Sequence, residues 1–216
     1  MQKLVLFPLF LIVLLSSCEK KEPFVYDYED DPLYTWGYAD FWGNYYQANA
    51  IDENVLTLSL FTNKLSIDAA SGKLQGTGQY LYLEDIFVAP ADTLLPEGTY
   101  TVSTATAPFH LAPGRELDVD GQKFEIGAFV YFVEPNELYT VTKFISSGTM
   151  KVVNAGIITR IDFDFTLNDS TRLKGRFEDP LPYFDSRFST STGEAHQRVT
   201  TVHTNRRISS SAVRLQ

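Results

Sequence analysis

The chain has 216 residues, of which 18 are basic and 27 are acidic, so its formal net charge is -9 at pH 7. A hydrophobic share of 44% is large enough for a packed core and excludes a wholly disordered chain. The acidic balance argues against a nucleic-acid partner, because phosphate recognition needs a basic face. One cysteine excludes a disulfide framework, and three histidines leave little for a His-rich centre, so we expect no metal and no other cofactor.

The first 17 residues have the pattern of a secretory signal peptide. Lys3 gives a basic start, an apolar run follows at residues 4–15, and two serines precede Cys18. This run would rise only about 18 Å as a helix, which is short of the roughly 30 Å hydrocarbon core of a bilayer. The pattern therefore favours a cleaved signal over a transmembrane helix.

The motif Leu15-Ser16-Ser17-Cys18 resembles the lipobox of bacterial lipoproteins, whose cysteine becomes the lipidated first residue of the mature chain. The resemblance implies that Cys18 carries a lipid anchor, which would be the chain's contact with a membrane. It also implies the bacterial cell envelope, at the outer membrane, with the periplasmic and surface faces both open. The alternative is an ordinary signal peptide in which this cysteine occurs by chance.

Two segments flank the expected domain at residues 34–183. Residues 18–33 are rich in acidic side chains and contain two prolines, which indicates an extended tether. Residues 184–216 are rich in Ser and Thr, and their five arginines and two acidic residues give a net charge of +3. They lack sustained alternation, so we expect a mostly disordered tail. It could fold onto the acidic body, contact anionic glycans, or be an extension without function.

The sequence of the central domain predicts an all-β fold. Apolar and polar residues alternate at 56–60, 160–167 and 172–177, and each pattern predicts a strand with one face in water. Residues 124–133 are apolar on both faces and predict a central strand with Gly127 as a bulge. Asp120-Gly121 lies before this run, as in a two-residue hairpin turn. We therefore expect an antiparallel β-sandwich or small barrel of about eight to ten strands.

Four segments of the domain look like a domain that recurs in Bacteroidetes-type cell-envelope lipoproteins. They are residues 78–88, 94–102, 147–153 and 160–185. Proteins with this domain are largely without assigned activity, so the resemblance implies a β fold and an envelope location but no catalytic residues. The basic tail departs from the pattern.

The segment 34–46 is the densest candidate binding site, because it holds both tryptophans and four tyrosines. Aromatic rings stack on the apolar faces of sugars while nearby polar side chains bind the hydroxyl groups. Two more tyrosines share one face of the predicted strand at 78–88. The candidate ligand-binding residues are Trp36, Tyr38, Asp40, Trp42, Asn44, Tyr45, Tyr80 and Tyr82. Alternatively these aromatic residues fill the core, although Gly37 and Gly43 favour an exposed loop.

Other motifs give weaker signals for chemistry. Residues 116–121 match the start of a calcium-binding EF-hand loop, but Gly127 occupies the position of the bidentate glutamate, so a plain hairpin is favoured. Asp162 and Asp164 share a strand face about 7 Å apart, a separation that could suit glycoside hydrolysis. No feature raises the pKa of either carboxyl group, and no catalytic nucleophile motif is present.

The sequence therefore predicts a membrane-anchored, non-catalytic cell-envelope lipoprotein that binds an extracellular ligand, for which we expect a glycan. The alternative is a structural or assembly lipoprotein that acts through an outer-membrane protein partner. A glycan hydrolase and a lipocalin-like carrier of apolar ligands are two less favoured interpretations; the second requires an internal cavity, which periodicity cannot reveal.

Overall fold

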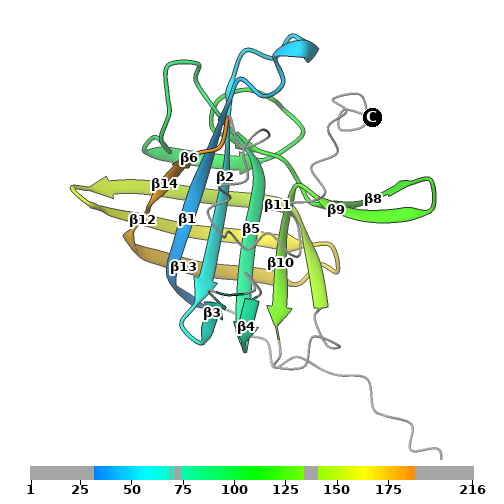
Figure 1. The fold of residues 1–216 in the computed structure, drawn as a ribbon, viewed down its shortest axis with the longest axis vertical. Coiled ribbons are helices and arrows are strands. Elements are labelled where there is room, and N and C mark those ends of the chain that lie inside the picture. The colour runs from blue at the N-terminus through cyan, green and yellow to red at the C-terminus, as the bar shows by residue number, and fades with distance from the viewer. Residues whose placement is uncertain (1–31, 69, 71–73, 134–140, 188–216) are drawn as a thin grey trace, which may run out of the picture.

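The computed structural model describes residues 32–68, 70, 74–133 and 141–187 (Figure 1). In these ranges the chain forms fourteen strands and one 3₁₀ helix, η1 (Gln47–Asn49), which confirms the all-β prediction. The strands are β1 (Leu33–Gly43), β2 (Asn54–Thr62), β3 (Leu65–Ile67), β4 (Leu74–Gly76), β5 (Gly78–Val88), β6 (Gly98–Val102), β7 (His110–Leu111), β8 (Arg115–Val119), β9 (Gln122–Ile126), β10 (Ala128–Val133), β11 (Val141–Ala155), β12 (Ile158–Leu167), β13 (Arg172–Pro180) and β14 (Tyr183–Asp185).

One large sheet closes on itself into a barrel-like shape. Its strand order is β10-β11-β12-β13-β1-β2-β5-β7-β6, and the pairs β10–β5 and β11–β6 join the two ends of this path. In Figure 1, β1, β2, β5 and β10 form a front layer, and β12 and β13 cross behind it with most of β11. We call β11, β12 and β13 the back layer. The strands thus pack as two crossing layers, an arrangement in which bulges and bends make the corners.

Strand β11 makes one of these corners. Residues 141–144 pair with β10 of the front layer, whereas residues 145–155 pair with β12 of the back layer. The register shifts between Ile145 and Ser147, and Gly148 follows with a φ of 124°. A bulge bends a strand, and glycine reaches this backbone conformation without a steric penalty.

The other closure uses parallel pairing, which departs from the purely antiparallel expectation. β13 pairs with β1 at only two positions, Leu33↔Arg176 and Tyr34↔Phe177. Farther along β1, strand β14 replaces β13 and pairs with residues 39–41. Pro180 ends β13 and Pro182 lies between β13 and β14, and because proline has no N–H donor, these residues interrupt the ladder there.

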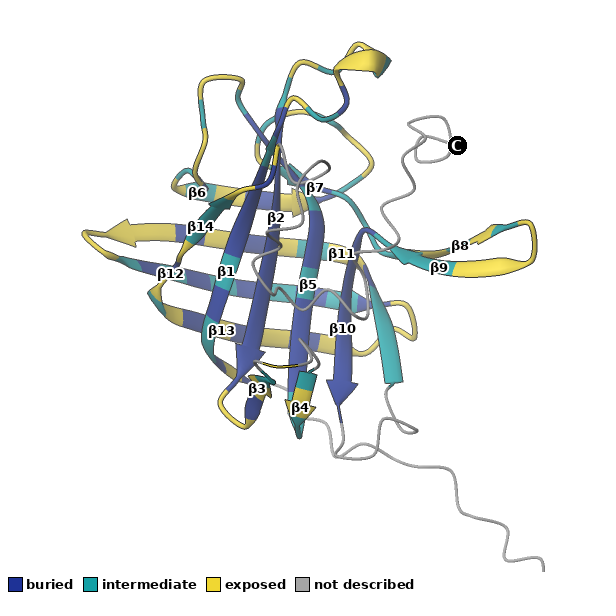
Figure 2. Cartoon of the chain, viewed as in Figure 1, coloured by how far each residue is buried: buried dark blue, intermediate teal, exposed yellow. Residues whose placement is uncertain are grey.

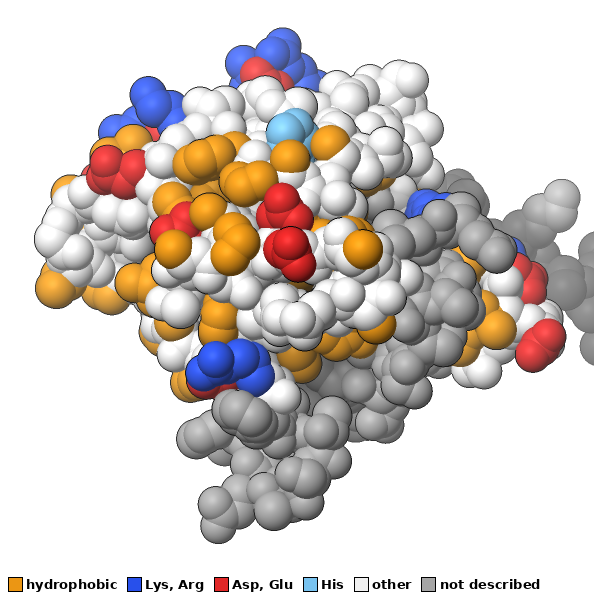
Figure 3. All heavy atoms as spheres, turned by 90° about the horizontal axis from the view of Figure 1, so that it is seen from above, with side chains coloured by type: hydrophobic (Ala, Val, Ile, Leu, Met, Phe, Trp, Pro, Cys, Tyr) orange, Lys and Arg blue, Asp and Glu red, His pale blue; other side chains and the backbone are white. Residues whose placement is uncertain are grey.

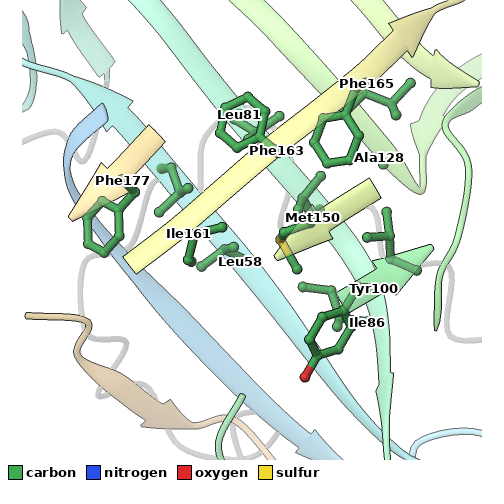
Figure 4. Packing of buried hydrophobic residues seen from close by; sticks show 14 of the residues in the cluster. Leu58, Leu81, Ile86, Tyr100, Ala128, Met150, Ile161, Phe163, Phe165 and Phe177 are labelled. Atoms are coloured by element: carbon green, nitrogen blue, oxygen red, sulfur yellow. The ribbon is translucent and has the colours of Figure 1, made fainter. Parts of the chain in front are cut away.

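Large apolar side chains fill the space between the two layers. Figure 4 shows members of this core, including Leu58 and Leu81 from the front layer and Ile161 and Phe163 from the back layer. The Phe163 and Phe165 rings stack with their centroids 5.1 Å apart. Burying each such side chain contributes roughly 1.5–3 kcal/mol to the stability of the fold. Because core side chains occupy the interior, the outer surfaces are the more favourable places for a ligand.

The hairpin expected at Asp120-Gly121 is confirmed, but the long strand that should follow it is divided. Both turn residues have positive φ, and β8 pairs with β9 on either side of them. Gly127, with a φ of 78°, separates β9 from β10. Strand β10 joins the barrel, whereas the β8–β9 hairpin projects from it (Figure 1). The predicted bulge is therefore a full break between two strands.

Burial along the strands differs between the layers (Figure 2). In the back layer, buried residues alternate with more exposed ones along β12 and β13, as the sequence predicts. Every residue of β2 is buried, so the prediction that Thr57 and Ser59 face water is wrong. Their hydroxyl groups are satisfied locally: Thr57 Oγ1 donates to the Glu84 carbonyl at 2.8 Å, and Ser59 Oγ lies 3.3 Å from Tyr80 Oη.

The first and last strands that the structure describes are β1 and β14. Tyr183, the expected last residue of the domain, begins β14, so Phe184 and Asp185 belong to the sheet. Cys18, the tether up to Asp31 and the tail from Phe188 onward lie outside the described residues. Among the described residues, none belongs to a helix with the length and hydropathy needed to cross a bilayer.

Candidate ligand-binding surface

A row of four aromatic rings crosses the outward side of the front layer. The register places Trp36 of β1 beside Phe61 of β2, Phe61 beside Tyr80 of β5, and Tyr80 beside Tyr131 of β10. Successive ring centroids are 3.9, 4.4 and 6.1 Å apart, with interplanar angles of 9°, 6° and 13°. Cross-strand aromatic pairs of this kind stabilise a sheet and also hold each ring in a fixed orientation.

A second row lies beside the first. It runs from Tyr38 through Ser59, Tyr82 and Phe129 to Phe144 of β11. Tyr82 contacts Phe129 at a centroid distance of 5.0 Å, and Phe129 meets Phe144 nearly edge-on at 6.3 Å. We call the aromatic side chains of both rows the aromatic face. They form one cluster, distinct from the barrel core, together with apolar residues of β3, β4 and β10.

The aromatic face brings together four of the eight predicted binding residues, namely Trp36, Tyr38, Tyr80 and Tyr82. Tyr80 is buried, and this burial raises the pKa of its hydroxyl well above 10.0. Trp36, Tyr38 and Tyr82 are half-buried, so part of each ring is accessible. The indole of Trp36 donates to the Leu65 carbonyl at 3.0 Å, which fixes its plane against β3.

The other four predicted residues lie elsewhere. Trp42 and Tyr45 belong to a smaller cluster with Tyr46, near the connection between β1 and β2. Asn44 is exposed in that connection, and Asp40 is buried, accepting a hydrogen bond from Ser186 Oγ at 3.0 Å. The eight residues therefore do not form a single site.

The expectation that Gly37 marks an exposed loop is wrong. Gly37 is buried within β1, and a Cβ atom on it would lie 2.4 Å from the Ser59 carbonyl oxygen. The glycine therefore allows a close approach between β1 and β2 beside the aromatic rows. Gly43, with a φ of 64°, ends β1 and is also buried.

Sequence analysis missed four members of the aromatic face, which are Phe61, Phe129, Tyr131 and Phe144. Strand β10 carried a signal for two of them, because its residues are apolar on both faces and so require a second buried surface. Phe61 directly follows the alternating run at 56–60, at an outward position. Phe144 could be placed only once its pairing with Phe129 was known.

The front layer has acidic residues at its outward side and no basic ones. Strands β1, β2, β5 and β10 contain Asp40, Glu84 and Asp85 but neither lysine nor arginine. Glu84 Oε2 accepts the Gly127 amide at 2.9 Å, and Glu125 of β9 accepts hydrogen bonds from the hydroxyls of Thr142 and Tyr131. The face thus combines fixed rings with hydrogen-bond acceptors, which is the chemistry that neutral hydroxylated ligands require.

The weaker candidate motifs do not form reactive sites. Asp118 Oδ1 accepts the Gly121 amide at 2.9 Å, which caps the hairpin turn. Burial alone would raise the pKa of Asp162, but hydrogen bonds from Arg160 and Arg176 lower it overall. The hydrogen bond from Arg172 is the largest of the effects that lower the pKa of Asp164. Both carboxyl groups therefore stay ionised, and neither is suited to act as a general acid.

The described part of the chain contains no group of three or more His, Cys, Asp or Glu side chains arranged to hold a metal ion. Comparisons of the chain with protein-family models, with curated proteins and with solved structures give no match.

Proposed function

We propose that this chain is a lipid-anchored, non-catalytic lipoprotein of the bacterial cell envelope that binds a glycan on its aromatic face. The observation that carries the proposal is the pair of aromatic rows, in which Trp36, Tyr38 and Tyr82 keep part of their rings accessible. The lipobox-like motif ending at Cys18 supports the anchor.

The arrangement suits a sugar better than a purely apolar ligand. The half-buried rings of Tyr38 and Tyr82 offer flat surfaces for the C–H faces of a pyranose, and tyrosine hydroxyl groups supply polar edges. Glu125, which is half-buried and accepts a hydrogen bond from the Tyr131 hydroxyl beside the face, can also accept one from a sugar hydroxyl. Because basic residues are absent from the four front-layer strands, a neutral glycan fits this face better than an anionic one.

Tryptophan fluorescence tests the proposal. Both tryptophans emit, so a Trp42→Phe background leaves Trp36 as the single reporter on the aromatic face. We expect a saturable fluorescence change with one class in a panel of soluble neutral glycans. Removing one stacking ring, in Tyr82→Ala, should weaken binding by about 1 kcal/mol, or roughly fivefold.

Tyr45→Ala is the matched control, because Tyr45 is also a half-buried tyrosine but belongs to the other aromatic cluster. It should leave glycan affinity unchanged. If no neutral glycan changes the emission of Trp36, or if both tyrosine variants weaken binding equally, glycan binding at the aromatic face is wrong.

A second candidate function, docking to an outer-membrane protein, has support at the loop end of the barrel. Leu94 and Phe109 are large apolar residues in the loops that flank β6, and Ile157, in the turn between β11 and β12, is 82% exposed. Viewed from above, hydrophobic and acidic side chains are interspersed on this end (Figure 3). Crosslinking in intact cells should recover one specific membrane protein, and Ile157→Asp should abolish its recovery. Recovery of the same protein with Ile157→Asp would count against docking at this end.

A further inference from the structure

The back layer carries a hollow on its outer side, away from the aromatic face. Its volume is about 510 Å³, and its walls include Leu33 of β1, Lys151 of β11, Phe163 of β12 and Lys174 of β13. This volume lies within the range of roughly 300–1,000 Å³ that is typical of small-molecule sites.

The hollow lies beside the place where β13 meets β1. These strands pair at only two positions, and Gly175 lies immediately before the first of them in β13. A Cβ atom at Gly175 would lie 2.4 Å from Cζ of Phe163, so the Phe163 ring, which is 4% exposed, packs directly against the Gly175 backbone beneath the hollow. Leu33, at 58% exposure, adds a second apolar surface. The floor of the hollow is therefore partly apolar.

Charged side chains in two cross-strand rows line the rest of the hollow. In one row Lys151, Asp162 and Arg176 are neighbours, and in the next row Asp164 lies between Thr149 and Lys174. Each carboxylate is shared by two cations. Asp162 binds Arg160 Nε at 2.8 Å and Arg176 Nε at 2.6 Å.

Asp164 is bound by Arg172 and lies 3.8 Å from the ammonium nitrogen of Lys174. Lys151 is exposed and forms no ion pair with the residues that the structure describes. Among the residues that line the hollow, Lys151, Lys174 and Arg176 are cations and Asp162 and Asp164 are anions, so the lining has a formal charge of +1.

This local excess of positive charge contrasts with the rest of the molecule. The whole chain has a net charge of -9, and the four front-layer strands contain no basic residue. At physiological ionic strength charges interact over only about 8 Å, so the hollow's own cations dominate its field. An anion would therefore be attracted to this hollow in particular and not to the protein in general.

We propose that the hollow is a second binding site, for an acidic ligand about the size of one to three sugar residues, such as a hexuronic acid oligosaccharide. Its carboxylate groups contact Lys151 and Lys174, and the apolar face of one ring lies against Leu33. The site does not depend on glycan binding by the aromatic face, because the two share no residue.

Calorimetric titration of the full-length chain with trigalacturonate tests this proposal, with maltotriose as the uncharged probe. The affinity for trigalacturonate should fall at least fivefold when 0.5 M NaCl is added, whereas any binding of the uncharged maltotriose should be insensitive to the salt. Lys151→Gln/Lys174→Gln should weaken trigalacturonate about tenfold. Both lysines are exposed, so the fold should be unaffected.

Lys64→Gln/Lys123→Gln is the matched control, since it removes the same charge from two exposed positions outside the hollow. It should change the affinity for trigalacturonate less than twofold. Equal losses in the two double variants, or no binding of trigalacturonate, would overturn the proposal. If inorganic sulfate competes for the hollow as effectively as trigalacturonate does, the assignment to a sugar acid is wrong and the hollow is a simple anion site. Tyr82→Ala should leave trigalacturonate binding intact, which separates this test from that of the aromatic face.

Discussion

The two layers of the barrel both turn apolar side chains inward, but their outward side chains differ in chemistry. In the front layer the outward positions of β2 and β10 are buried, and an aromatic row crosses them. In the back layer the outward positions of β12 and β13 carry ion pairs such as Asp162–Arg176 and are accessible. The contrast shows that the inward side chains of a strand form the barrel core, whereas its outward side chains determine which ligands that side of the barrel can bind.

The two outward sides should also differ in their contribution to stability. Rings of the aromatic face form a second hydrophobic cluster, so they add buried apolar area beyond the barrel core. The charged rows of the back layer lie in water, where an ion pair typically contributes about 0–1 kcal/mol. Outward positions of the front layer should therefore behave as core positions when mutated.

The largest effect is expected at Phe61, whose side chain is fully buried between the rings of Trp36 and Tyr80. Phe61→Ala removes both stacking contacts and leaves a cavity, so it should lower the free energy of unfolding by about 3–5 kcal/mol. Urea denaturation, with the m-value checked for constancy, measures this change.

Lys174→Ala provides the comparison from the back layer. It is also at an outward position of a central strand, but its side chain is half-exposed. Its effect should stay within about 0.5 kcal/mol. Similar losses in the two variants would mean that the layers do not differ in the way described.

A smaller loss of stability is expected from crowding the front layer at Gly37. Alanine there would place its Cβ 2.4 Å from the Ser59 carbonyl oxygen and 2.6 Å from Leu60 Cδ2. Because backbone must shift to accommodate it, Gly37→Ala should cost about 1–3 kcal/mol in the same urea assay.

Gly156 is a suitable control, since no atom lies within 4 Å of a Cβ built on it. Its φ of 66° lies in the left-handed region, which asparagine adopts more readily than most residues, so Gly156→Asn should cost no more than about 1 kcal/mol. If Gly37→Ala is as mild as this control, the close approach of β1 and β2 is not a constraint on the aromatic face.

Sequence patterns located the strands of the back layer better than those of the front layer. Residues 160–167 and 172–177 alternate cleanly because one side of the sheet faces the core and the other faces water. Alternation at 56–60 suggested the same arrangement, yet Thr57 and Ser59 are buried by neighbours on other strands. Periodicity reports on a strand alone, and whether its polar side meets water depends on contacts far along the chain.

The candidate site shows the same limit. Tyr80 and Tyr82 could be assigned to one strand face, and Trp36 and Tyr38 could be recognised as an aromatic group, from local sequence. Their union depends on Phe61, which links β1 to β5 across β2. That register involves residues 25 and 19 positions apart, and closure by the parallel pairing of β1 with β13 and β14 involves still longer separations. Local patterns contain no information on such pairings.

The smallest predicted effect concerns the ion pair between Lys143 of β11 and Asp169 in the β12–β13 turn. Hydrogen bonds from Lys143 and Thr171 lower the pKa of Asp169 from 3.8 to about 2. Because the folded-state pKa is depressed, the ionised carboxylate stabilises the fold fully above the unfolded-state pKa. This stabilisation is lost as the pH falls through 3.8 toward 2. Both side chains are about one-third exposed, so water screens the pair and its contribution should not exceed about 1 kcal/mol.

Asp169→Asn should therefore lower the free energy of unfolding by up to about 1 kcal/mol at pH 7, and the difference from the parent chain should close near pH 2. Thermal unfolding of both proteins across this pH range measures the difference, and 1 M NaCl at pH 7 should reduce it. The backbone amide of Thr171 also donates to Asp169 Oδ1 at 3.0 Å, a bond that the asparagine oxygen can keep. If the difference in unfolding free energy between the two proteins stays constant from pH 7 to pH 2, the stabilisation comes from the geometry of the turn. The ion pair would then contribute nothing, which is the lower end of the range of about 0–1 kcal/mol for ion pairs in water.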